Sequence, residues 1–383
     1  MNILLVAGED SGDRHAAGLV RALRRDFSAG EMVFFGAAGA NMRAEGVETI
    51  VESDDFGIVG VPEVLKAVPM FWRVMRRLEE EAVDRKADVA VLVDFPEFNL
   101  KLAKRLRKRG IRVVYYISPQ IWAWRGYRIR GIRKYVDLLL TILPFEKQWY
   151  LERGVSHVEF AGNPLAGTVA HSVDRKDFRE ELGIEDKQKL VALLPGSRSK
   201  EIQRIFPVML EAAKLLYEKD GNFAFAAALA KSRASDELLR HVNSANVPFE
   251  VLIVRDDTYN LLNAADAAAV TSGTATLETA IIGTPQVIVY KTSSLNYRLL
   301  MPLISAEHVG LANLIAGRGV FKELIQHDLT PSNLASELLR ISSAEFSEKL
   351  RREAESIRNA LGAEDCYLNA AREIRRFLET GID

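Results

Sequence analysis

The sequence has few residues that form covalent cross-links and no long hydrophobic run. Its 383 residues include one cysteine, Cys366, so no disulfide can form within the chain. No apolar stretch approaches the roughly 18 residues of a membrane-spanning helix. The apolar segment that begins the chain is short and lacks the basic residues of a signal peptide. We therefore expect a cytoplasmic protein, long enough to bury large cores without disulfides.

Metal-binding patterns are also missing. The chain contains no Asp-x-Asp motif, and its 6 histidines form no cluster with the cysteine. We therefore predict no metal site and no cofactor. A departing anionic group would instead be stabilised by the amide groups at helix N-termini and by arginine side chains.

Charge is nearly balanced over the whole chain but unevenly distributed. The formal net charge is −1, whereas residues 101–150 carry 13 Lys or Arg against only Asp137 and Glu146. Such a block can meet phosphates, anionic lipid or nucleic acid, or it can form a solvated helix face. The near-neutral total argues against a nucleic-acid-binding module, so we expect no nucleic-acid partner.

Short apolar segments alternate with helical patterns along the first half of the chain. Residues 89–93 are all apolar, which indicates a strand buried on both faces, as in a parallel sheet covered by helices. The alternation is typical of an α/β doubly wound unit. The strands predicted here are 3–7, 32–35, 88–94, 112–117, 138–143 and 158–160.

The second half repeats the order of strand, glycine loop and helix. We predict an N-terminal domain of residues 1–168, a C-terminal domain of residues 169–342 and a helical tail of residues 343–383. Because ligands of open α/β sheets bind at the carboxyl ends of the strands, we expect a cleft between those ends of the two sheets. The strands predicted in the second domain are 190–194, 223–228, 249–254, 267–270 and 286–290.

Two loops of the second domain have the composition of anion-binding turns. Residues 195–198 follow a strand and open a helix, so backbone amides and Arg198 can meet a phosphate. Residues 272–278 form a second small-residue loop, in which Glu278 can accept hydrogen bonds from the two hydroxyls of a ribose. Either loop alone is also compatible with a tight turn or a capped helix. Together they indicate a site for a nucleoside diphosphate.

Carboxylates follow two predicted strands of the first domain. Asp94 ends an apolar strand and is a candidate general base, although a turn or helix-capping aspartate has the same pattern. Glu9, Ser11 and Asp13 lie in the first loop on the same edge of the sheet. They can hold acceptor hydroxyls or cap the first helix.

Two further segments combine aromatic residues with arginine. In residues 115–125, tyrosines and tryptophans precede Arg125, which suits stacking on bases or sugars as well as ordinary packing. In residues 61–77, large apolar residues lie among basic ones, which suits an interfacial membrane patch or a buried helix. The membrane-patch candidates are Leu65, Val68, Met70, Phe71, Trp72 and Met75.

The ordered set of motifs resembles that of the lipid-A-disaccharide synthase family. Each motif is weak alone, but the set runs over nearly the whole chain and is specific. It comprises Gly8-Glu9-x-Ser11-Gly12-Asp13, Gly36-x-x-Gly39-x-x-Met42, Asp94-x-Pro96-x-Phe98-Asn99, Ser118-Pro119-x-x-Trp122-Ala123-Trp124-Arg125, Leu143-Pro144-Phe145-Glu146, Leu194-Pro195-Gly196-Ser197-Arg198, Ser272-Gly273-Thr274-Ala275 and Asn313-Leu314-x-Ala316-Gly317-Arg318.

The resemblance implies a GT-B fold, with two Rossmann-like domains, and an inverting glycosyl transfer. The implied donor is UDP-2,3-diacylglucosamine, and the implied acceptor is 2,3-diacylglucosamine 1-phosphate, which attacks through its 6-hydroxyl. The implied products are UDP and the β-1,6-linked disaccharide 1-phosphate of lipid A biosynthesis. The alternative is another GT-B enzyme that uses UDP-N-acetylglucosamine, either an epimerase or a peptidoglycan-type transferase.

The resemblance also implies residue roles. Asp94 is the implied base, and Arg198 the implied partner of the diphosphate. The implied donor site comprises Gly196, Ser197, Glu201, Ser272, Gly273, Thr274, Ala275, Glu278 and Asn313. The acceptor-site candidates are Glu9, Ser11, Asp13, Asn99, Trp124 and Arg125.

Location and assembly are implied in the same way. The family implies peripheral association with the inner face of the inner membrane. It further implies that the C-terminal tail packs on the N-terminal domain or on a partner subunit of a homodimer.

Overall fold

A computed structural model describes most of the chain, as two compact units. The described residues are 1–26, 32–52, 64–229, 236–294, 297–298, 307–362 and 365–380, with only the backbone of residues 64–68. The first unit comprises Met1–Gly167 with Leu361–Asp383, and the second comprises Thr168–Ala360.

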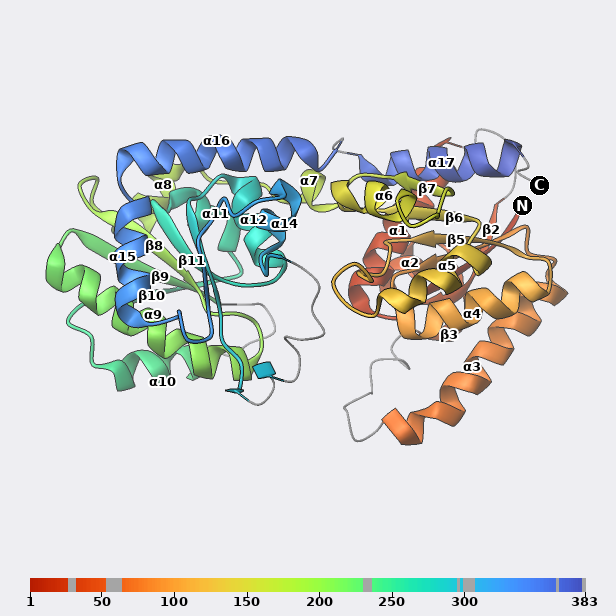
Figure 1. The fold of residues 1–383 in the computed structure, drawn as a ribbon, viewed down its shortest axis with the longest axis horizontal. Coiled ribbons are helices and arrows are strands. Elements are labelled where there is room, and N and C mark those ends of the chain that lie inside the picture. The colour runs from red at the N-terminus through yellow and green to blue at the C-terminus, as the bar shows by residue number, and fades with distance from the viewer. Residues whose placement is uncertain are drawn as a thin grey trace. The chain divides into compact units, whose positions relative to one another are not determined.

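The first unit is built on a parallel sheet. Its seven described strands have the order β3-β2-β1-β4-β5-β6-β7. The adjacent pairs run parallel throughout, so all the strands present their carboxyl ends on one edge (Figure 1). The strands are β1 (Asn2–Ala7), β2 (Val33–Ala38), β3 (Glu48–Glu52), β4 (Val89–Val93), β5 (Arg112–Tyr116), β6 (Leu138–Thr141) and β7 (Val158–Phe160).

Helices cover both faces of this sheet. Along β4, Val89, Val91 and Val93 belong to one hydrophobic core, and Ala90 and Leu92 belong to the core on the other face. All five are fully buried, as the uninterrupted apolar run predicts. The helices are α1 (Asp10–Asp26), α2 (Ala40–Ala44), α3 (Val64–Asp84), α4 (Pro96–Lys108), α5 (Ile129–Tyr135), α6 (Pro144–Leu151), α7 (Leu165–Thr168, at the boundary of the units) and α17 (Cys366–Thr380).

The second unit repeats this architecture. Its six described strands form a parallel sheet of order β10-β9-β8-β11-β12-β13. They are β8 (Lys189–Leu194), β9 (Phe223–Leu229), β10 (Val251–Arg255), β11 (Ala267–Thr271), β12 (Gln286–Tyr290) and β13 (Glu323–Ile325). Its described helices are α8 (Arg175–Glu181), α9 (Ser199–Lys219), α10 (Asp236–Ala245), α11 (Thr258–Ala264), α12 (Thr274–Ile282), α14 (Leu311–Ala316), α15 (Pro331–Ile341) and α16 (Ala344–Ala360).

The predicted α/β class, with two Rossmann-like units, is therefore confirmed. The eleven strands predicted from the sequence are all present, with ends that differ by a few residues. Two strands, β3 and β13, were not predicted. Both are short edge strands that begin with glutamate, and they lack the continuous apolar pattern of a strand buried on two faces.

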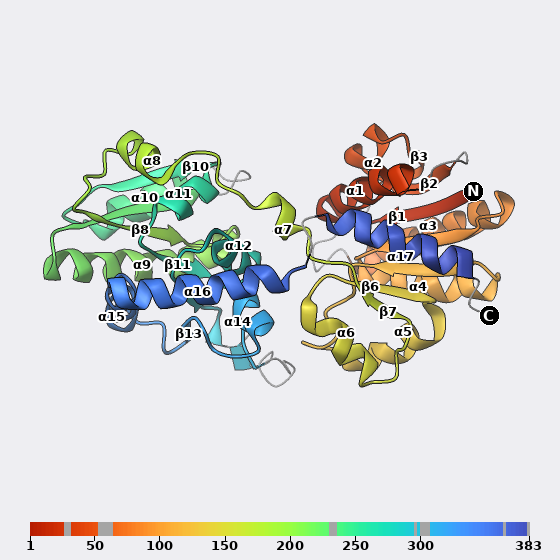
Figure 2. The same ribbon diagram turned by 90° about the horizontal axis from the view of Figure 1, so that it is seen from above.

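The structure divides the segment that we expected to form one C-terminal tail. Helix α16 packs on α12 and α14 of the second unit, burying Leu350, Ala354 and Ile357. Helix α17 belongs to the first unit and lies along α1 (Figure 2). The buried side chains of α17, including Ile374 and Phe377, join the same core as β1 and β4. The predicted boundary at residue 343 would assign α16 to the tail, whereas in the structure α16 belongs to the second unit.

Tyr367 fixes the contact between α17 and α1. Its hydroxyl lies 3.0 Å from Nδ1 of His15. A Cβ atom at Gly18 would stand only 2.7 Å from the Tyr367 ring, so glycine lets the two helices approach closely. Arg25 at the end of α1 forms an ion pair with Asp365. These contacts attach the C-terminal helix to the N-terminal one.

Gly36 provides a test of the sheet packing. Its φ is +150°, and a Cβ atom there would lie 2.0 Å from the carbonyl oxygen of Leu5 on the adjacent strand. We expect Gly36→Ala to lower the free energy of unfolding by about 3 kcal/mol, because the strained backbone and the steric clash both oppose the fold. Urea denaturation measures the change.

Gly110→Ala is the matched control. Gly110 also has a positive φ, +81°, but an added Cβ would meet no atom within 4 Å. Only the conformational cost, about 1–2 kcal/mol, is then expected. Equal losses for the two variants would contradict the proposed clash with Leu5.

Candidate active site

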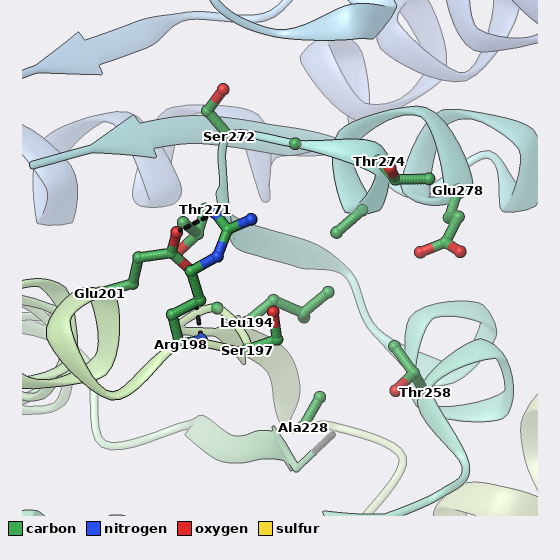
Figure 3. A pocket seen from close by; sticks show the side chains of 13 residues that line it. Leu194, Ser197, Arg198, Glu201, Ala228, Thr258, Thr271, Ser272, Thr274 and Glu278 are labelled. Atoms are coloured by element: carbon green, nitrogen blue, oxygen red, sulfur yellow. Dashed lines mark hydrogen bonds and ion pairs between the residues drawn. The ribbon is translucent and has the colours of Figure 1, made fainter. Parts of the chain in front are cut away.

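The second unit contains a cavity of about 390 Å³ at the carboxyl ends of its central strands. Figure 3 shows the side chains around it, contributed by the ends of β8, β9 and β11 and by the starts of α9, α11 and α12. Its lining comprises Leu194, Gly196, Ser197, Arg198, Glu201, Ala228, Thr258, Thr271, Ser272, Gly273, Thr274, Ala275 and Glu278. The two loops predicted to bind a nucleoside diphosphate thus meet at one cavity.

The loop after β8 needs its glycine. Gly196 has φ +102°, and a Cβ atom at this position would lie 2.7 Å from Oε2 of Glu201. Arg198 is the N-cap of α9, and its Nη1 donates to Oε1 of Glu201 at 3.0 Å. The Arg198 side chain is nevertheless 81% exposed, so its remaining donors face the cavity and solvent (Figure 3). Glu201 therefore orients an arginine that is still able to bind an anion.

The loop after β11 opens α12 with a second unusual glycine. Gly273 is the N-cap residue and has φ +148°. Ser272 donates from Oγ to the carbonyl oxygen of Val309 at 2.8 Å, which fixes the loop at its start. Thr274 and Ala275 begin the helix, and their amide groups belong to a helix N-terminus at the wall of the cavity.

Glu278 lies one turn inside α12 and lines the same cavity. Its Oε1 accepts a hydrogen bond from the Tyr259 hydroxyl at 3.0 Å. Burial raises the pKa of Glu278, while the Tyr259 hydrogen bond opposes that shift. Glu278 and Arg198 lie at different ends of the cavity drawn in Figure 3. Tyr259 was not predicted as part of the site because no sequence pattern links it to Glu278.

Asn313, predicted to contact the donor, has another role in the structure. Its Nδ2 donates to the carbonyl oxygen of Phe321 and to Oε1 of Glu323, and its Oδ1 accepts from the amides of Val320 and Phe321. These four bonds use the full capacity of the amide group. Asn313 is also completely buried. The side chain of Asn313 therefore fixes the loop between α14 and β13 and has no donor or acceptor left for a ligand.

In the first unit, Asp94 lies directly after β4, at the carboxyl edge of the sheet. Asp94 and Phe95 both have φ +48°, a strained conformation for residues other than glycine. The turn is fixed from two sides, because the Tyr115 hydroxyl and the Asn99 side-chain amide donate to the carbonyl oxygen of Asp94 at 2.6 and 2.9 Å. Neither of these two bonds involves the Asp94 carboxylate.

The environment of Asp94 suits a proton acceptor. Burial and the nearby charge of Glu9 raise the pKa of Asp94 to about 6, although the Phe95 amide opposes the shift. A carboxylate with this pKa is ionised at neutral pH and is a stronger base than an ordinary aspartate. A perturbed pKa combined with backbone strain is typical of a functional site.

Two acceptor-site candidates are buried and have structural roles. Asp13 is 2% exposed, and its carboxylate accepts hydrogen bonds from the amides of Gly39, Asn41 and Met42. It therefore stabilises the N-terminus of α2. Asn99 is fully buried and holds the Asp94 turn through its amide group. Neither side chain can contact a substrate in this structure, so both predictions are corrected.

The other acceptor candidates remain accessible. Glu9 is exposed and Ser11 half-buried at the start of α1. Trp124 is 46% exposed, and the Arg125 guanidinium lies 4.1 Å above its ring. Arg125 and Arg128 both form ion pairs with Glu97, which lies three residues after Asp94. These ion pairs connect the segment that contains Trp124 and Arg125 to α4, which begins two residues after Asp94.

The membrane-patch prediction is corrected in part. Met75 is 3% exposed and packs in the core, and Phe71 is half-buried against Phe95 and Phe98. Trp72 is 55% exposed, and Met70 is half-buried. The side chains of Leu65 and Val68 lie outside the described residues. Helical periodicity explains why some of these residues are buried and others are exposed, since one face of α3 packs on α4 and the opposite face does not.

Arginines surround the exposed tryptophan. A hollow of about 440 Å³ is lined by Pro69, Trp72, Arg73, Arg76 and Arg105. The Arg105 guanidinium lies 5.7 Å from the centre of the Trp72 ring.

In the part of the chain that the structure describes, none of the helices has the length and apolarity needed to cross a bilayer. Among those same residues, no group of His, Cys, Asp and Glu is arranged to hold a metal ion.

A family model described as Lipid-A-disaccharide synthetase matches residues 3–373. The chain belongs to this family. A lipid-A-disaccharide synthase from Trichlorobacter lovleyi is 40% identical over 361 residues, covering 94% of this chain and 93% of the relative. The enzyme from Myxococcus xanthus is 40% identical over 381 residues, covering 99% and 98%. Family membership makes the protein a glycosyltransferase of lipid A biosynthesis.

Solved structures with the same fold share little sequence with this family member. The calicheamicin glycosyltransferase CalG4 has a TM-score of 0.62 at 17% identity, covering 100% of this chain and 99% of CalG4. A UDP-GlcNAc 2-epimerase from Neisseria meningitidis, solved with UDP-GlcNAc, has a TM-score of 0.62 at 13% identity, covering 99% and 100%. The likeness establishes the GT-B fold. The family match, not the fold, disfavours the epimerase and peptidoglycan-type alternatives.

The raised pKa of Asp94 has a consequence for stability. The folded protein binds a proton at Asp94 up to pH about 6, against 3.8 for an ordinary aspartate, so the stability contributed by this group falls as pH rises through that range. We expect Asp94→Asn to increase the free energy of unfolding at pH 8 by about 2–3 kcal/mol. Asparagine also tolerates the positive φ.

The pH dependence distinguishes this effect from a general gain in packing. The stability difference between Asp94→Asn and the unmodified protein, measured by urea denaturation, should shrink as pH is lowered from 8 to 4.5. A difference independent of pH would mean that the Asp94 carboxylate is not destabilised in the folded state.

Proposed function

We propose that this protein joins UDP-2,3-diacylglucosamine to the 6-hydroxyl of 2,3-diacylglucosamine 1-phosphate, with inversion, to form the β-1,6-linked disaccharide 1-phosphate and UDP. The observation that carries the proposal is the match of residues 3–373 to the family model, supported by 40% identity to relatives named for this activity. Donor binding is assigned to the second unit and acceptor activation to the first.

The cavity of the second unit supports the donor assignment. Its wall combines the glycine turns at Gly196 and Gly273 with the N-termini of α9 and α12, which are suited to a diphosphate. Arg198 supplies the positive charge that stabilises departing UDP. Glu278 is half-buried and lines the same cavity, and we assign to its carboxylate the hydrogen bonds from the ribose hydroxyls. Ser197, Ser272, Thr274, Ala275 and Glu201 complete the proposed donor site.

Asp94 is the proposed base for the acceptor. An α-linked donor that gives a β product requires a single in-line displacement, and hence one base and no covalent intermediate. Deprotonation of the 6-hydroxyl by Asp94 as it attacks the anomeric carbon meets this requirement. Glu9, Ser11, Trp124 and Arg125 are the proposed acceptor contacts. Arg125 offers charge, and the exposed Trp124 offers an apolar surface for the sugar.

The hollow on α3 supports peripheral attachment to a membrane. Trp72 is an aromatic residue suited to the bilayer interface, and Arg73 and Arg76 beside it are suited to anionic head groups. Both substrates carry acyl chains, so an enzyme that uses them must meet a lipid surface. We therefore propose that the protein acts at the inner face of the inner membrane, with α3 at the surface. We also propose that the protein forms a homodimer.

The decisive experiment is a product assay with the diacylated donor and acceptor in mixed micelles. Mass spectrometry should detect the disaccharide 1-phosphate, and proton NMR of the new anomeric centre should show the β linkage. Unacylated UDP-N-acetylglucosamine serves as the control substrate. Epimerisation of that control, without disaccharide formation from the acylated pair, would refute the proposal.

We expect Asp94→Ala to reduce turnover by about 10²–10⁴, the usual contribution of a general base, with little change in UDP affinity. Because the pKa of Asp94 is about 6, the rate should be constant above pH 7 and fall as pH drops below 6. Glu9→Gln removes a negative charge that raises this pKa, and should move the acidic limb to lower pH. Near-normal turnover in Asp94→Ala would exclude Asp94 as the base.

We expect Arg198→Ala to weaken UDP binding about tenfold, measured by calorimetry, because a charge-assisted contact to the diphosphate is lost. Arg352→Ala is the matched control. Arg352 is also exposed, also lies in the second unit and also pairs with a glutamate of its own helix, but it is absent from the cavity lining. Unchanged UDP affinity in Arg198→Ala would remove Arg198 from the donor site.

A further inference from the structure

Glu146 is a buried carboxylate that the proposed mechanism does not use. It lies in the first turn of α6 and is 1% exposed. Each of its oxygens is approached by two donors. Oε2 accepts from the amides of Leu143 and Ile142 at 3.0 and 3.3 Å. Oε1 accepts from Ser118 Oγ at 2.8 Å and from Trp122 Nε1 at 2.9 Å.

These four bonds connect two different loops. Ile142 and Leu143 follow β6, whereas Ser118 and Trp122 belong to the segment of residues 118–125 that follows β5. Capping of α6 requires only the Oε2 bonds. The Oε1 bonds therefore have a second role. They anchor the 118–125 segment to α6.

The 118–125 segment needs such an anchor because its backbone is strained at both ends. Ile117, just before it, has φ +64°, which is a rare conformation for a β-branched residue. Arg125, at its end, has φ +58°. Residues in such conformations persist only where surrounding contacts hold them. Between these two points, the segment contains few backbone hydrogen bonds of its own.

Two more contacts converge on the same anchor. The Trp122 ring meets the Phe145 ring edge-on, with centroids 4.9 Å apart. The Tyr150 hydroxyl donates to the carbonyl oxygen of Pro119 at 3.1 Å. Phe145, Glu146 and Tyr150 all lie on α6, so one helix holds the buried half of the segment. The other half ends in Trp124 and Arg125, which are exposed.

We propose that Glu146 is a positioning residue of the acceptor site, whose carboxylate holds residues 118–125 so that Trp124 and Arg125 are presented to the sugar phosphate. The proposal rests on the acceptor contacts assigned under the proposed function. Glu146 contacts no substrate itself, because its side chain is buried. Its effect reaches the acceptor through Trp122, two residues before Trp124.

Substitution by glutamine tests the role of the carboxylate with little change in shape. An amide group has one oxygen and one NH₂, so in either orientation of the introduced side chain its NH₂ group faces two donors. Glu146→Gln should therefore raise the KM for the acceptor about tenfold, with a smaller change in kcat and with unchanged UDP affinity. Hydrogen exchange should quicken in residues 118–125 and stay constant in the second unit.

Trp122→Phe tests the same link from its other end. It removes the indole donor and keeps an aromatic ring against Phe145, so it remains informative if Glu146→Gln folds poorly. We expect the same rise in the acceptor KM. Because both variants remove the Trp122–Glu146 bond, the double variant should show less than the product of the two single effects. Multiplicative effects would overturn the proposed link.

Asp137→Asn is the control for a general loss of stability. Asp137 precedes β6, at the opposite edge of the same sheet, where its carboxylate accepts from the Val113 amide at 2.8 Å and pairs with Arg107. This variant should leave the acceptor KM unchanged. An equal rise in Asp137→Asn, or unchanged exchange of residues 118–125 in Glu146→Gln, would overturn the proposal. Absence of product from the unmodified protein would instead refute the proposed function, before any variant is compared.

Discussion

In both units, the described strands pair in parallel, so their carboxyl ends lie on one edge of each sheet. The loops that follow neighbouring strands therefore emerge side by side, however far apart they are in the sequence. The loop after β8 and the loop after β11 meet at one cavity for this reason. The Asp94 turn and the 118–125 segment are neighbours in the first unit because β4 and β5 are adjacent. The chemistry of each unit depends on this geometry.

Three carboxylates of the first unit show how the environment assigns different roles to similar side chains. Asp13 and Glu146 are both buried, and each accepts at least four hydrogen bonds, so each connects separate segments of backbone. The hydrogen bonds that fix the Asp94 turn go to its carbonyl oxygen and not to its carboxylate. Burial raises the pKa of Asp94 to about 6 and that of Glu146 to about 7, but four donors occupy both oxygens of Glu146, whereas the Asp94 carboxylate is only half-buried and is opposed in its shift by the Phe95 amide alone.

The low identity of the solved structures, 13% and 17%, shows that this fold tolerates nearly complete sequence change. Most of the motifs that carry the family resemblance lie at or just after the carboxyl ends of strands. Gly196 and Gly273 provide backbone turns with positive φ at the wall of the cavity, and in the proposed donor site Arg198 supplies the positive charge. The sheets provide rigid support for loops of this kind.

The architecture, the family and the two loops that line the cavity of the second unit could be predicted from the residues alone. Apolar runs such as residues 89–93 have no alternative to burial on both faces, and the glycine turns mark where strands end. The strands β3 and β13 were not predicted, because strands at the edge of a sheet have a weaker apolar pattern than central strands. The motif that contains Glu146 was visible, yet nothing in it indicated a bond to Trp122.

Which polar side chains are accessible, by contrast, became clear only from the packing of the folded chain. Asp13, Asn99 and Asn313 have the residue types and loop positions of ligand contacts, but each is buried and hydrogen-bonded to backbone. Asp13 binds amides of residues 39–42, Asn313 binds residues 320–321, and Asn99 binds the carbonyl groups of Val93 and Asp94 just before it. Met75 likewise proved to be core, whereas Trp72, three residues earlier, is exposed. Whether such a side chain is buried and fully hydrogen-bonded depends on how the segments around it pack, which the residue types alone do not show.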